Sequence, residues 1–257
     1  MNMSYSKTTA DRHAVVTHDE WIAARKQLLA RERELTHLRD SIASDRRNLP
    51  WERVDKHYLF DTPEGPRALS ALLGKHRQLI VQHFMFAPDW EQGCPSCSYM
   101  ADHADGMTVH LAQRDIAFVV ISRAPLAMIE PFRQRMGWHF NWVSSHGTEF
   151  NYDYGVSFLP EQHATGKVHY NYCDQYFPDV EAPGISVFYK DDDNNIFHTY
   201  STYSRGVEVM MGAYCLMDLT PIGRNERGVP NKMEWVRHHD RYDVSEAGTS
   251  SCCRAAT

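Results

Sequence analysis

The feature that most constrains the fold is a Cys-x-x-Cys pair placed just after a buried strand and a short loop. Residues 79–86 are largely apolar, which is typical of a central parallel strand covered by helices on both faces. A loop follows, and the run Gly93-Cys94-Pro95-Ser96-Cys97 then opens an expected helix. A strand, a loop and such a pair at the start of a helix together indicate a thiol–disulfide redox site.

The chemistry of this pair depends on where its first cysteine lies. Only a thiolate attacks a disulfide or a peroxide. The start of the expected helix places unpaired backbone N–H groups and the positive end of the helix dipole near Cys94, which stabilises its thiolate. Pro95 suits the first helical turn, where its missing N–H is not needed. Cys97 lies one turn further on, near enough to close a disulfide.

A metal site is the competing interpretation, because Cys-x-x-Cys also begins many zinc sites. Zinc needs about four ligands, and no second Cys-x-x-Cys or His-x-x-x-His follows at the usual distance. The remaining ligands would have to come through the fold from His83, His103, Cys173 or the Cys252-Cys253 pair. We therefore predict no bound metal and no cofactor, and favour redox chemistry over a metal-binding or redox-sensing module.

Length and charge limit the remaining classes of protein. The chain has 257 residues, 42% of them hydrophobic, and a net charge of -6. It can bury a sizeable core without disulfide bonds, and its acidic balance disfavours nucleic acid as a partner. No apolar run reaches the roughly 20 residues that span a bilayer, and the first residues lack the apolar core of a signal peptide. We expect a cytoplasmic protein, no membrane partner, and six cysteines that are thiols.

A helical arm is expected before the thiol region. Thr17 and Glu20 form a capping box. Apolar residues then recur at roughly helical spacing, at Trp21, Leu28, Leu35 and Leu38. They predict an amphipathic helix from about 18 to 43 that packs on the domain or on a second subunit. A homodimer is therefore one expectation.

Strands and helices alternate through the middle of the chain. Strands are expected at 79–86, 116–122 and 140–143, with helices at 95–113 and 126–136. Because the order is β-α-β-α-β, it predicts a parallel sheet with right-handed crossovers and a site at the carboxyl ends of the strands.

Residues 144–180 are aromatic and polar with little periodicity. We interpret them as a long insertion over one edge of the sheet, placed as a lid over the cysteines. Strands at 185–190 and 196–201, joined by an Asp/Asn cluster, predict an antiparallel hairpin. A helix at about 205–217 closes the domain, and Cys215 within it is expected in the core.

These elements resemble the thioredoxin superfamily, because the strand, Cys94-Pro95-Ser96-Cys97, the crossover, and Pro183 ahead of the hairpin and last helix follow in the same order. The runs 86–97, 122–125 and 150–153 are similar to a bacterial family of thioredoxin-like proteins of unknown function. The resemblance implies an α/β fold, a thioredoxin-like three-layer sandwich with a central mixed sheet, helices on both faces and an N-terminal helical arm.

The same resemblance implies roles for three residues. In that superfamily the first cysteine is the exposed nucleophile, the second resolves the mixed disulfide, and a cis-proline faces both. The matching residues are Cys94, Cys97 and Pro183. The loop before Cys94 differs from that of thioredoxins, which place Trp directly beside the first cysteine. The peroxiredoxin pattern of Pro, Thr or Ser, and Cys does not align on either cysteine.

Three neighbouring residues are candidates for substrate binding. Arg123 follows the second buried strand, so its guanidinium is expected beside the loop 87–93, holding a thiolate or a peroxide oxygen; pairing with a carboxylate is the alternative. Asp89 and Glu91 are candidate proton carriers, with simple solvation as the alternative. Trp90 is expected to form a wall of the substrate cleft or to pack.

The sequence thus predicts a domain at 51–220, preceded by an arm at 1–50 and followed by an extension and tail at 221–257. The leading function is a thiol–disulfide oxidoreductase that cycles Cys94 and Cys97 on a protein or small-molecule substrate. A metal-binding or redox-sensing module and a thiol peroxidase are the alternatives. The sequence leaves open whether Cys173 or the Cys252-Cys253 pair takes part.

Overall fold

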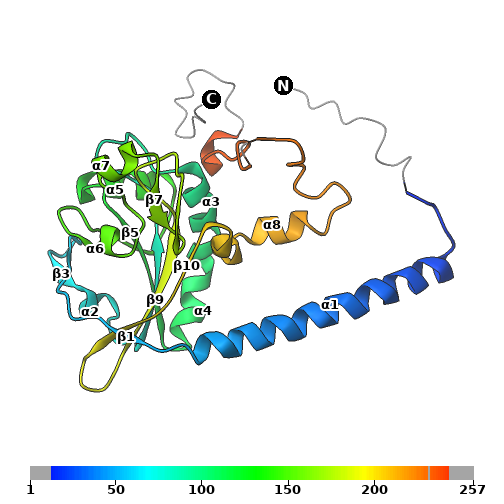
Figure 1. Cartoon of the computed structure of the whole chain (residues 1–257), viewed down its shortest axis with the longest axis horizontal. Coiled ribbons are helices and arrows are strands. Elements are labelled where there is room, and N and C mark those ends of the chain that lie inside the picture. The colour runs from blue at the N-terminus through cyan, green and yellow to red at the C-terminus, as the bar shows by residue number, and fades with distance from the viewer. Residues whose placement is uncertain (1–12, 231, 243–257) are drawn as a thin grey trace.

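A central mixed sheet organises the computed structural model, which describes residues 13–230 and 232–242 (Figure 1). Three strands run parallel: β4 (Gln78–His83), β5 (Ile116–Ser122) and β6 (Asn141–Ser144). The antiparallel strands are β9 (Gly184–Lys190), β10 (Ile196–Tyr203) and β1 (Glu52–Arg53). The order across the sheet is β1-β10-β9-β4-β5-β6. The predicted mixed sheet, its parallel β-α-β-α-β unit and its hairpin are therefore confirmed.

Helices cover both faces of this sheet. One face packs against α3 (Pro95–Ala104) and α5 (Leu126–Arg135), with Met100 and Phe132 buried between helix and strand. The other face packs against α2 (Leu69–Leu72) and α6 (Phe150–Asp153), where Leu79 and Val81 of β4 are fully buried. Because both faces of the sheet are covered, the sequences of β4 and β5 are nearly continuous apolar runs and do not alternate between apolar and polar residues.

Two predicted elements are shorter than expected. The strand expected at 79–86 ends at His83. The helix expected at 95–113 is broken into α3, a 3₁₀ turn at Asp105–Met107, and α4 (Thr108–Ala112). At the break, the Asp105 carboxylate accepts the backbone N–H groups of His139 and Phe140 at 2.7 and 3.0 Å. The Asp105 side chain thus bonds the loop at 139–140. The next residue, Gly106, has a low helix propensity, and the α-helix is interrupted at these two positions.

The insertion has secondary structure of its own. It contains α6, α7 (Pro160–Ala164) and a small hairpin of β7 (Val168–Tyr170) and β8 (Cys173–Gln175). Val156, Phe158, Val168 and Tyr170 of the insertion form a separate buried cluster with Ala182 and Tyr203. Another small hairpin, β2 (Leu59–Phe60) with β3 (Arg67–Ala68), lies outside the main sheet.

The C-terminal part differs from expectation. The helix expected at 205–217 is a 3₁₀ segment, Ser204–Met210, followed by α8 (Gly212–Met217). Cys215 was expected in the core and is exposed, because Tyr214 is the residue of this short helix that faces the core. The extension after residue 220 contributes to the core, since Val236 is buried in the same cluster as the two motif cysteines. A last 3₁₀ turn spans His239–Arg241.

The N-terminal arm is a single helix, α1 (His18–Arg47), that extends away from the sheet (Figure 1). It begins as predicted, with Thr17 and Glu20 bonded reciprocally in a capping box. None of its residues is buried, so its predicted packing on the domain is wrong. Within the described residues, no helix has both the length and the apolar character that crossing a membrane requires.

Candidate functional site: a buried thiol pair in a cavity

The two motif cysteines lie just beyond the carboxyl end of β4. Cys94 immediately precedes α3, and Pro95 is the first residue of that helix. The Met85 carbonyl accepts the Cys94 N–H at 3.0 Å, and the Met85 N–H donates to the Cys97 sulfur at 3.5 Å. Both side chains are thiols in this structure and are buried, with exposed fractions of 4% for Cys94 and 1% for Cys97. The exposed nucleophile that the resemblance implied is therefore not seen.

Glycine is required immediately before Cys94. A Cβ atom added to Gly93 would lie 2.5 Å from a ring carbon of Phe84. The Gly93 carbonyl accepts the Nε2–H of His238 at 2.8 Å, while Nδ1 of that ring accepts a bond from Arg135 at 2.9 Å. Burial is the main cause that lowers the pKa of His238, so the ring is neutral. A residue of the C-terminal extension thus holds the turn that carries Cys94.

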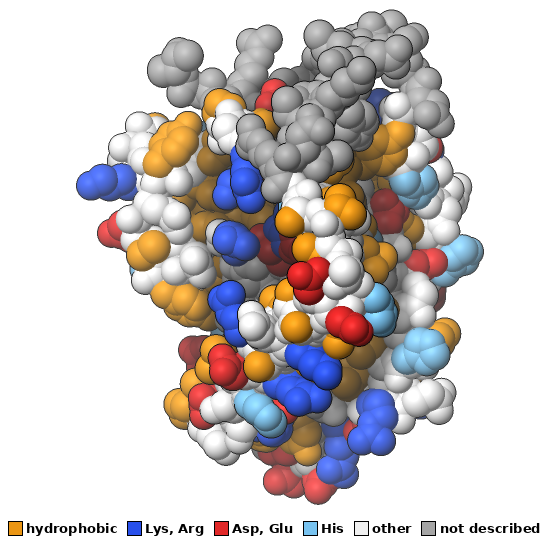
Figure 2. Space-filling model, turned by 90° about the vertical axis from the view of Figure 1, so that its right-hand side faces the viewer, with side chains coloured by type: hydrophobic (Ala, Val, Ile, Leu, Met, Phe, Trp, Pro, Cys, Tyr) orange, Lys and Arg blue, Asp and Glu red, His pale blue; other side chains and the backbone are white. Residues whose placement is uncertain are grey.

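A cavity of about 760 Å³ opens onto both cysteines. Its lining comes from the motif, the insertion, the residue before β9 and the segment after β10, including Met85, Met100, Tyr170, Phe177, Asp179, Pro183, Val207, Met211 and Arg224. Figure 2 shows a face of the molecule on which basic side chains gather along a hollow with apolar walls. The insertion does contribute to the wall, in agreement with its expected position beside the cysteines.

Tyr170 joins three of these segments. Its hydroxyl donates to the Pro183 carbonyl at 2.7 Å and accepts the backbone N–H of Ser204 at 2.8 Å. Burial raises the pKa of Tyr170, so the hydroxyl keeps its proton and both bonds. The insertion is therefore fastened to the start of β9 and to the end of β10.

Pro183 lies where the resemblance places it, immediately before β9 and on the cavity wall. Its peptide bond is trans, since the described part of the chain contains no cis bond. The implied cis-proline is therefore wrong for this chain. The trans form is the favoured one for X-Pro bonds by about 0.5–1 kcal/mol, and here the Pro183 carbonyl is held by Tyr170.

Asp179 is a cavity residue that the sequence did not single out. It is half-buried, and its carboxylate has no hydrogen-bond partner among the described residues. Burial raises its pKa from 3.8 to about 6, against the opposing effect of His163. No local pattern marks this residue, because its position depends on how the insertion folds over the thiols.

Arg123, Asp89 and Trp90 do not line the cavity. The Arg123 Nε donates to Glu181 Oε1 at 2.6 Å, and its guanidinium also bonds and stacks on Tyr152. The Glu181 side chain is only 1% exposed, so the carboxylate pairing weighed as the alternative for Arg123 is present and buried. Asp89 is exposed, and Trp90 packs partly buried against the cluster that contains the cysteines.

The other two cysteines that the structure describes, Cys173 and Cys215, are not among the residues that line the cavity. Cys173 is exposed and donates weakly to the Tyr170 carbonyl at 3.6 Å. Cys252 and Cys253 lie outside the described residues. Over residues 13–230 and 232–242, no group of three His, Cys, Asp or Glu side chains is placed to hold a metal ion.

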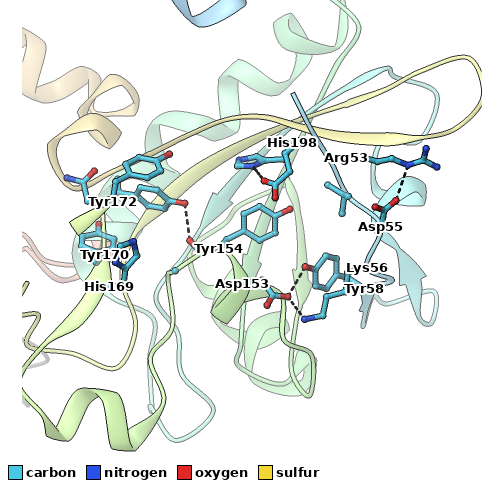
Figure 3. Close-up of a pocket in the computed structure, with 15 residues that line it drawn as sticks. Arg53, Asp55, Lys56, Tyr58, Asp153, Tyr154, His169, Tyr170, Tyr172 and His198 are labelled. Atoms are coloured by element: carbon cyan, nitrogen blue, oxygen red, sulfur yellow. Dashed lines mark hydrogen bonds and ion pairs between the residues drawn. The ribbon is translucent and has the colours of Figure 1, made fainter. Parts of the chain in front are cut away.

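A second, smaller pocket of about 360 Å³ lies against β1 and β10 (Figure 3). Its charged side chains largely pair with one another, as in the contacts of Lys56 with Asp153 at 2.6 Å and of Arg53 with Asp55 at 2.9 Å. No cysteine is among its lining residues. The cavity over the thiols is therefore the better candidate for a catalytic site.

Comparison with known proteins gives a family and a set of distant structural likenesses. A family model described as "Bacterial protein of unknown function (DUF899)" matches residues 10–242. No curated protein matches the chain significantly.

Among solved structures, peroxidoxin BcpB from Mycobacterium tuberculosis is 16% identical, with a TM-score of 0.43, over 63% of this chain and 96% of that one. Peroxiredoxin Q from Xanthomonas campestris is 10% identical, with a TM-score of 0.40, over 60% and 87%. The mitochondrial 2-Cys peroxiredoxin from Plasmodium falciparum is 10% identical, with a TM-score of 0.37, over 65% and 92%. Likenesses this distant carry no argument about activity, and the fold assignment rests on the strand order and layers.

Proposed function

The chain belongs to the bacterial family of unknown function DUF899, and we propose that it is a thiol–disulfide oxidoreductase that cycles Cys94 and Cys97 between dithiol and disulfide. The observation that carries this proposal is a cavity that opens onto two thiols one helical turn apart, at the N-terminus of a ten-residue helix. A thiolate at that position benefits from the helix dipole and from unpaired backbone N–H groups.

The two cysteines have separate roles in this proposal. The Cys94 thiolate attacks one sulfur of a substrate disulfide, which forms a mixed disulfide and releases the first substrate thiolate. The Cys97 thiolate then attacks the Cys94 sulfur, which forms the Cys94–Cys97 bond and releases the second substrate thiolate. The Met85 N–H, 3.5 Å from the Cys97 sulfur, stabilises that second attacking thiolate.

We assign positioning roles to the residues around the pair. Pro183 contributes to the cavity wall beside the sulfurs, and Tyr170 holds it there. Arg123, Asp89 and Trp90 were predicted to bind substrate; because they lie outside the cavity lining, we propose that they support the segment between β4 and Cys94. The backbone contact between Ala124 N–H and the Phe86 carbonyl at 2.8 Å joins their two segments.

Mass spectrometry of the peptide that carries both cysteines tests the proposal. Oxidation of the reduced protein by a small disulfide should remove two hydrogen atoms from this peptide by forming the Cys94–Cys97 bond, and dithiothreitol should restore them. With the same disulfide, a Cys97→Ser variant should instead stop at a mixed disulfide on Cys94. Failure to form a reversible Cys94–Cys97 bond would end the redox proposal.

A thiol peroxidase is the second candidate, because a buried thiol in a small cavity also admits a hydroperoxide. Cys94 would then be oxidised to a sulfenic acid and Cys97 would condense with it, releasing water. Under this alternative, Cys94→Ser abolishes peroxide consumption and Cys97→Ser accumulates the sulfenic acid. Equal peroxide consumption by both variants and the wild type would dismiss it.

A metal-binding or redox-sensing module uses the same pair without turnover. It is tested by elemental analysis of protein purified without chelator, in which about one zinc or copper per chain would support it.

We also propose a cytoplasmic location, because a reducing compartment maintains the dithiol form, and we retain the arrangement of arm, domain and extension. The apolar residues of α1 are exposed, as in Trp21 at 53% and Leu38 at 55%, which supports self-association through this helix. Sedimentation of the full chain and of a Leu28→Glu/Leu35→Glu variant tests it, and a monomeric wild type would contradict it.

A further inference from the structure

We propose that the substrate is a small-molecule disulfide with an apolar body and an acidic group, rather than the disulfide of a folded protein. This inference rests on the proposed thiol–disulfide activity and adds the chemical class of its substrate. Three observations carry it: the burial of the sulfurs, the apolar walls beside them, and two basic lining side chains that have no acidic partner within the described part of the chain.

The burial of both cysteines limits what can reach them. Their exposed fractions are 4% and 1%, so a substrate disulfide must enter the cavity before the Cys94 thiolate can attack it. The cavity of about 760 Å³ lies within the range of roughly 300–1,000 Å³ that is typical of small-molecule sites. A disulfide on the surface of a folded protein would have to project into this cavity to reach the sulfurs.

The cavity wall does not move aside easily. Tyr170 is 2% exposed and fastens the insertion to both Pro183 and Ser204 through its hydroxyl. On the opposite wall, the Glu226 carboxylate accepts bonds from the Tyr214 hydroxyl at 2.6 Å and from the Trp235 indole at 2.8 Å. A protein substrate would have to break these partly buried contacts before it reached Cys94.

The lining close to the thiols is apolar. Side chains of Met85, Met100, Val207 and Met211 are buried in the same cluster as Cys94 and Cys97, with Phe177 packed against it. A substrate with an aromatic or aliphatic body is stabilised in the cavity because it removes this apolar surface from water. Methionine-rich walls also adapt to irregular apolar shapes.

The charges of the lining favour an anionic substituent. Most acidic side chains there are already engaged: Glu208 and Asp218 pair with Arg224, and Glu226 bonds Tyr214 and Trp235. Arg227 and Lys232 also line the cavity and have no acidic partner among the described residues. A carboxylate on the substrate would meet these two cations at close range, where opposite charges attract each other most strongly.

Asp179 is the one lining carboxylate without a hydrogen-bond partner among the described residues. It faces His163 from α7 and shares the cavity with Arg205, Glu208 and Arg224. Among the described lining residues, the four acidic side chains balance the four basic ones, so the attraction of an anionic group is local to Arg227 and Lys232 and is not a property of the whole cavity.

The reaction balances with one external reductant. Two electrons pass from the Cys94 and Cys97 thiols to the substrate R–S–S–R, the two thiol protons end on the two released R–S groups, and the protein retains the Cys94–Cys97 bond. A small dithiol then reduces that bond and closes the cycle.

The test compares three oxidants on the reduced full-length protein: 5,5′-dithiobis(2-nitrobenzoate), which is anionic and aromatic; 2,2′-dithiodipyridine, which is aromatic and neutral; and insulin, a folded protein disulfide. Formation of the Cys94–Cys97 bond is followed by acid quenching and peptide mass spectrometry, so reaction at exposed Cys173 and Cys215 does not contribute. Each rate is divided by the rate at which the same oxidant reacts with dithiothreitol. Both small disulfides should exceed insulin by at least about tenfold on this scale, as burial of the nucleophile requires.

A charge variant tests the acidic group. Arg227→Gln/Lys232→Gln should lower the normalised rate with the nitrobenzoate about fivefold and leave that with dithiodipyridine within about twofold, because only the first probe carries charge. The matched control Lys26→Gln/Arg31→Gln removes the same charge from exposed positions of α1 and should change neither rate. Added salt should reduce the difference between variant and wild type.

Insulin reacting as fast as the small disulfides would overturn the size limit, and a variant that slows both small probes equally would overturn the anionic preference. In either case the Cys94–Cys97 bond still forms, so the redox proposal stands. If diamide, a small general thiol oxidant, also fails to form that bond, the proposed function itself fails.

Discussion

Asp179→Asn should stabilise the protein at alkaline pH and leave it unchanged in acid. Burial raises the pKa of this carboxyl from 3.8 to about 6, so its ionised form is disfavoured in the folded chain. The folded-state pKa lies above the unfolded one. The stabilising contribution of the protonated group is therefore complete below about pH 3.8 and is lost as pH rises through about 6.

The size of the effect follows from that change. A rise from 3.8 to about 6 corresponds to about 3 kcal/mol at 1.36 kcal/mol per pH unit. Asp179 is only half-buried, and solvent screening reduces such contributions, so we expect about 1 to 2 kcal/mol. Asparagine carries no charge at any pH, so the Asp179→Asn variant does not lose this unfolding free energy as the pH rises.

Urea denaturation at about pH 5 and about pH 8 measures it. The free energy of unfolding of Asp179→Asn relative to wild type should increase by about 1 kcal/mol between the two values. Asp193→Asn, in the exposed turn between β9 and β10, is the matched control and should show no such change. An equal difference at both pH values would refute the reasoning that Asp179 is held in a partly desolvated cavity.

Three further predictions concern the frame of the site. Gly93→Ala, whose Cβ would lie 2.5 Å from Phe84, should lose about 1–3 kcal/mol of unfolding free energy in urea, whereas Gly106→Ala, with nothing within 4 Å, should not; equal stability of the two variants would contradict the crowding. Arg123→Met should cost about 3–5 kcal/mol because it leaves Glu181 buried and unpaired, and adding Glu181→Leu should recover part of that loss; no recovery would show that Glu181 is not the cause. Burial lowers the pKa of His83 from 6.5 to about 3, so unfolding free energy should fall as pH drops below about 6.5, and less steeply in His83→Gln; parallel pH profiles in urea would reject this assignment.

Local signals predicted those elements whose determinants lie close together in the sequence. The strand at 116–122 is reproduced by β5, because a continuous apolar run begins directly after Asp115, whose positive φ of 61° ends the preceding segment. The hairpin turn was predicted for a local reason as well. The Asp191 carboxylate accepts the backbone N–H groups of Asp193 and Asn195 at 2.9 and 2.8 Å, which is the turn chemistry expected of aspartate.

Features that depend on contacts between distant parts of the chain were not predicted from the sequence. α3 ends where the Asp105 carboxylate accepts the backbone N–H of His139, which lies more than thirty residues away. No local sequence pattern predicts this hydrogen bond. β1 is two residues long and pairs with β10 across more than 140 positions. Such pairings are set by tertiary packing rather than by strand propensity.

The cavity shows the same division between local and long-range determinants. The Cys94-Pro95-Ser96-Cys97 turn is local and was found, whereas Asp179 and the segment 204–233 reach the thiols only through the fold. Arg123 was placed next to the thiols from its position after β5, but its guanidinium turns to Glu181, fifty-eight residues later. The buried carboxylate of Glu181 forms a charge-assisted hydrogen bond with this guanidinium, which is stronger than the bonds that water would offer it.

In the proposed reaction, reactivity and selectivity depend on different segments of the chain, which one histidine links. The sulfurs and the helix N-terminus belong to the motif, while the basic lining residues belong to the segment 204–233. His238 follows that segment and donates to the Gly93 carbonyl at 2.8 Å, so the chain that forms the outer wall also supports the turn before Cys94. His238→Ala should consequently slow the reaction of the thiol pair with every oxidant, whereas Arg227→Gln should slow only its reaction with anionic oxidants. A His238→Ala protein that reacts normally with dithiodipyridine would show that the turn does not depend on this support.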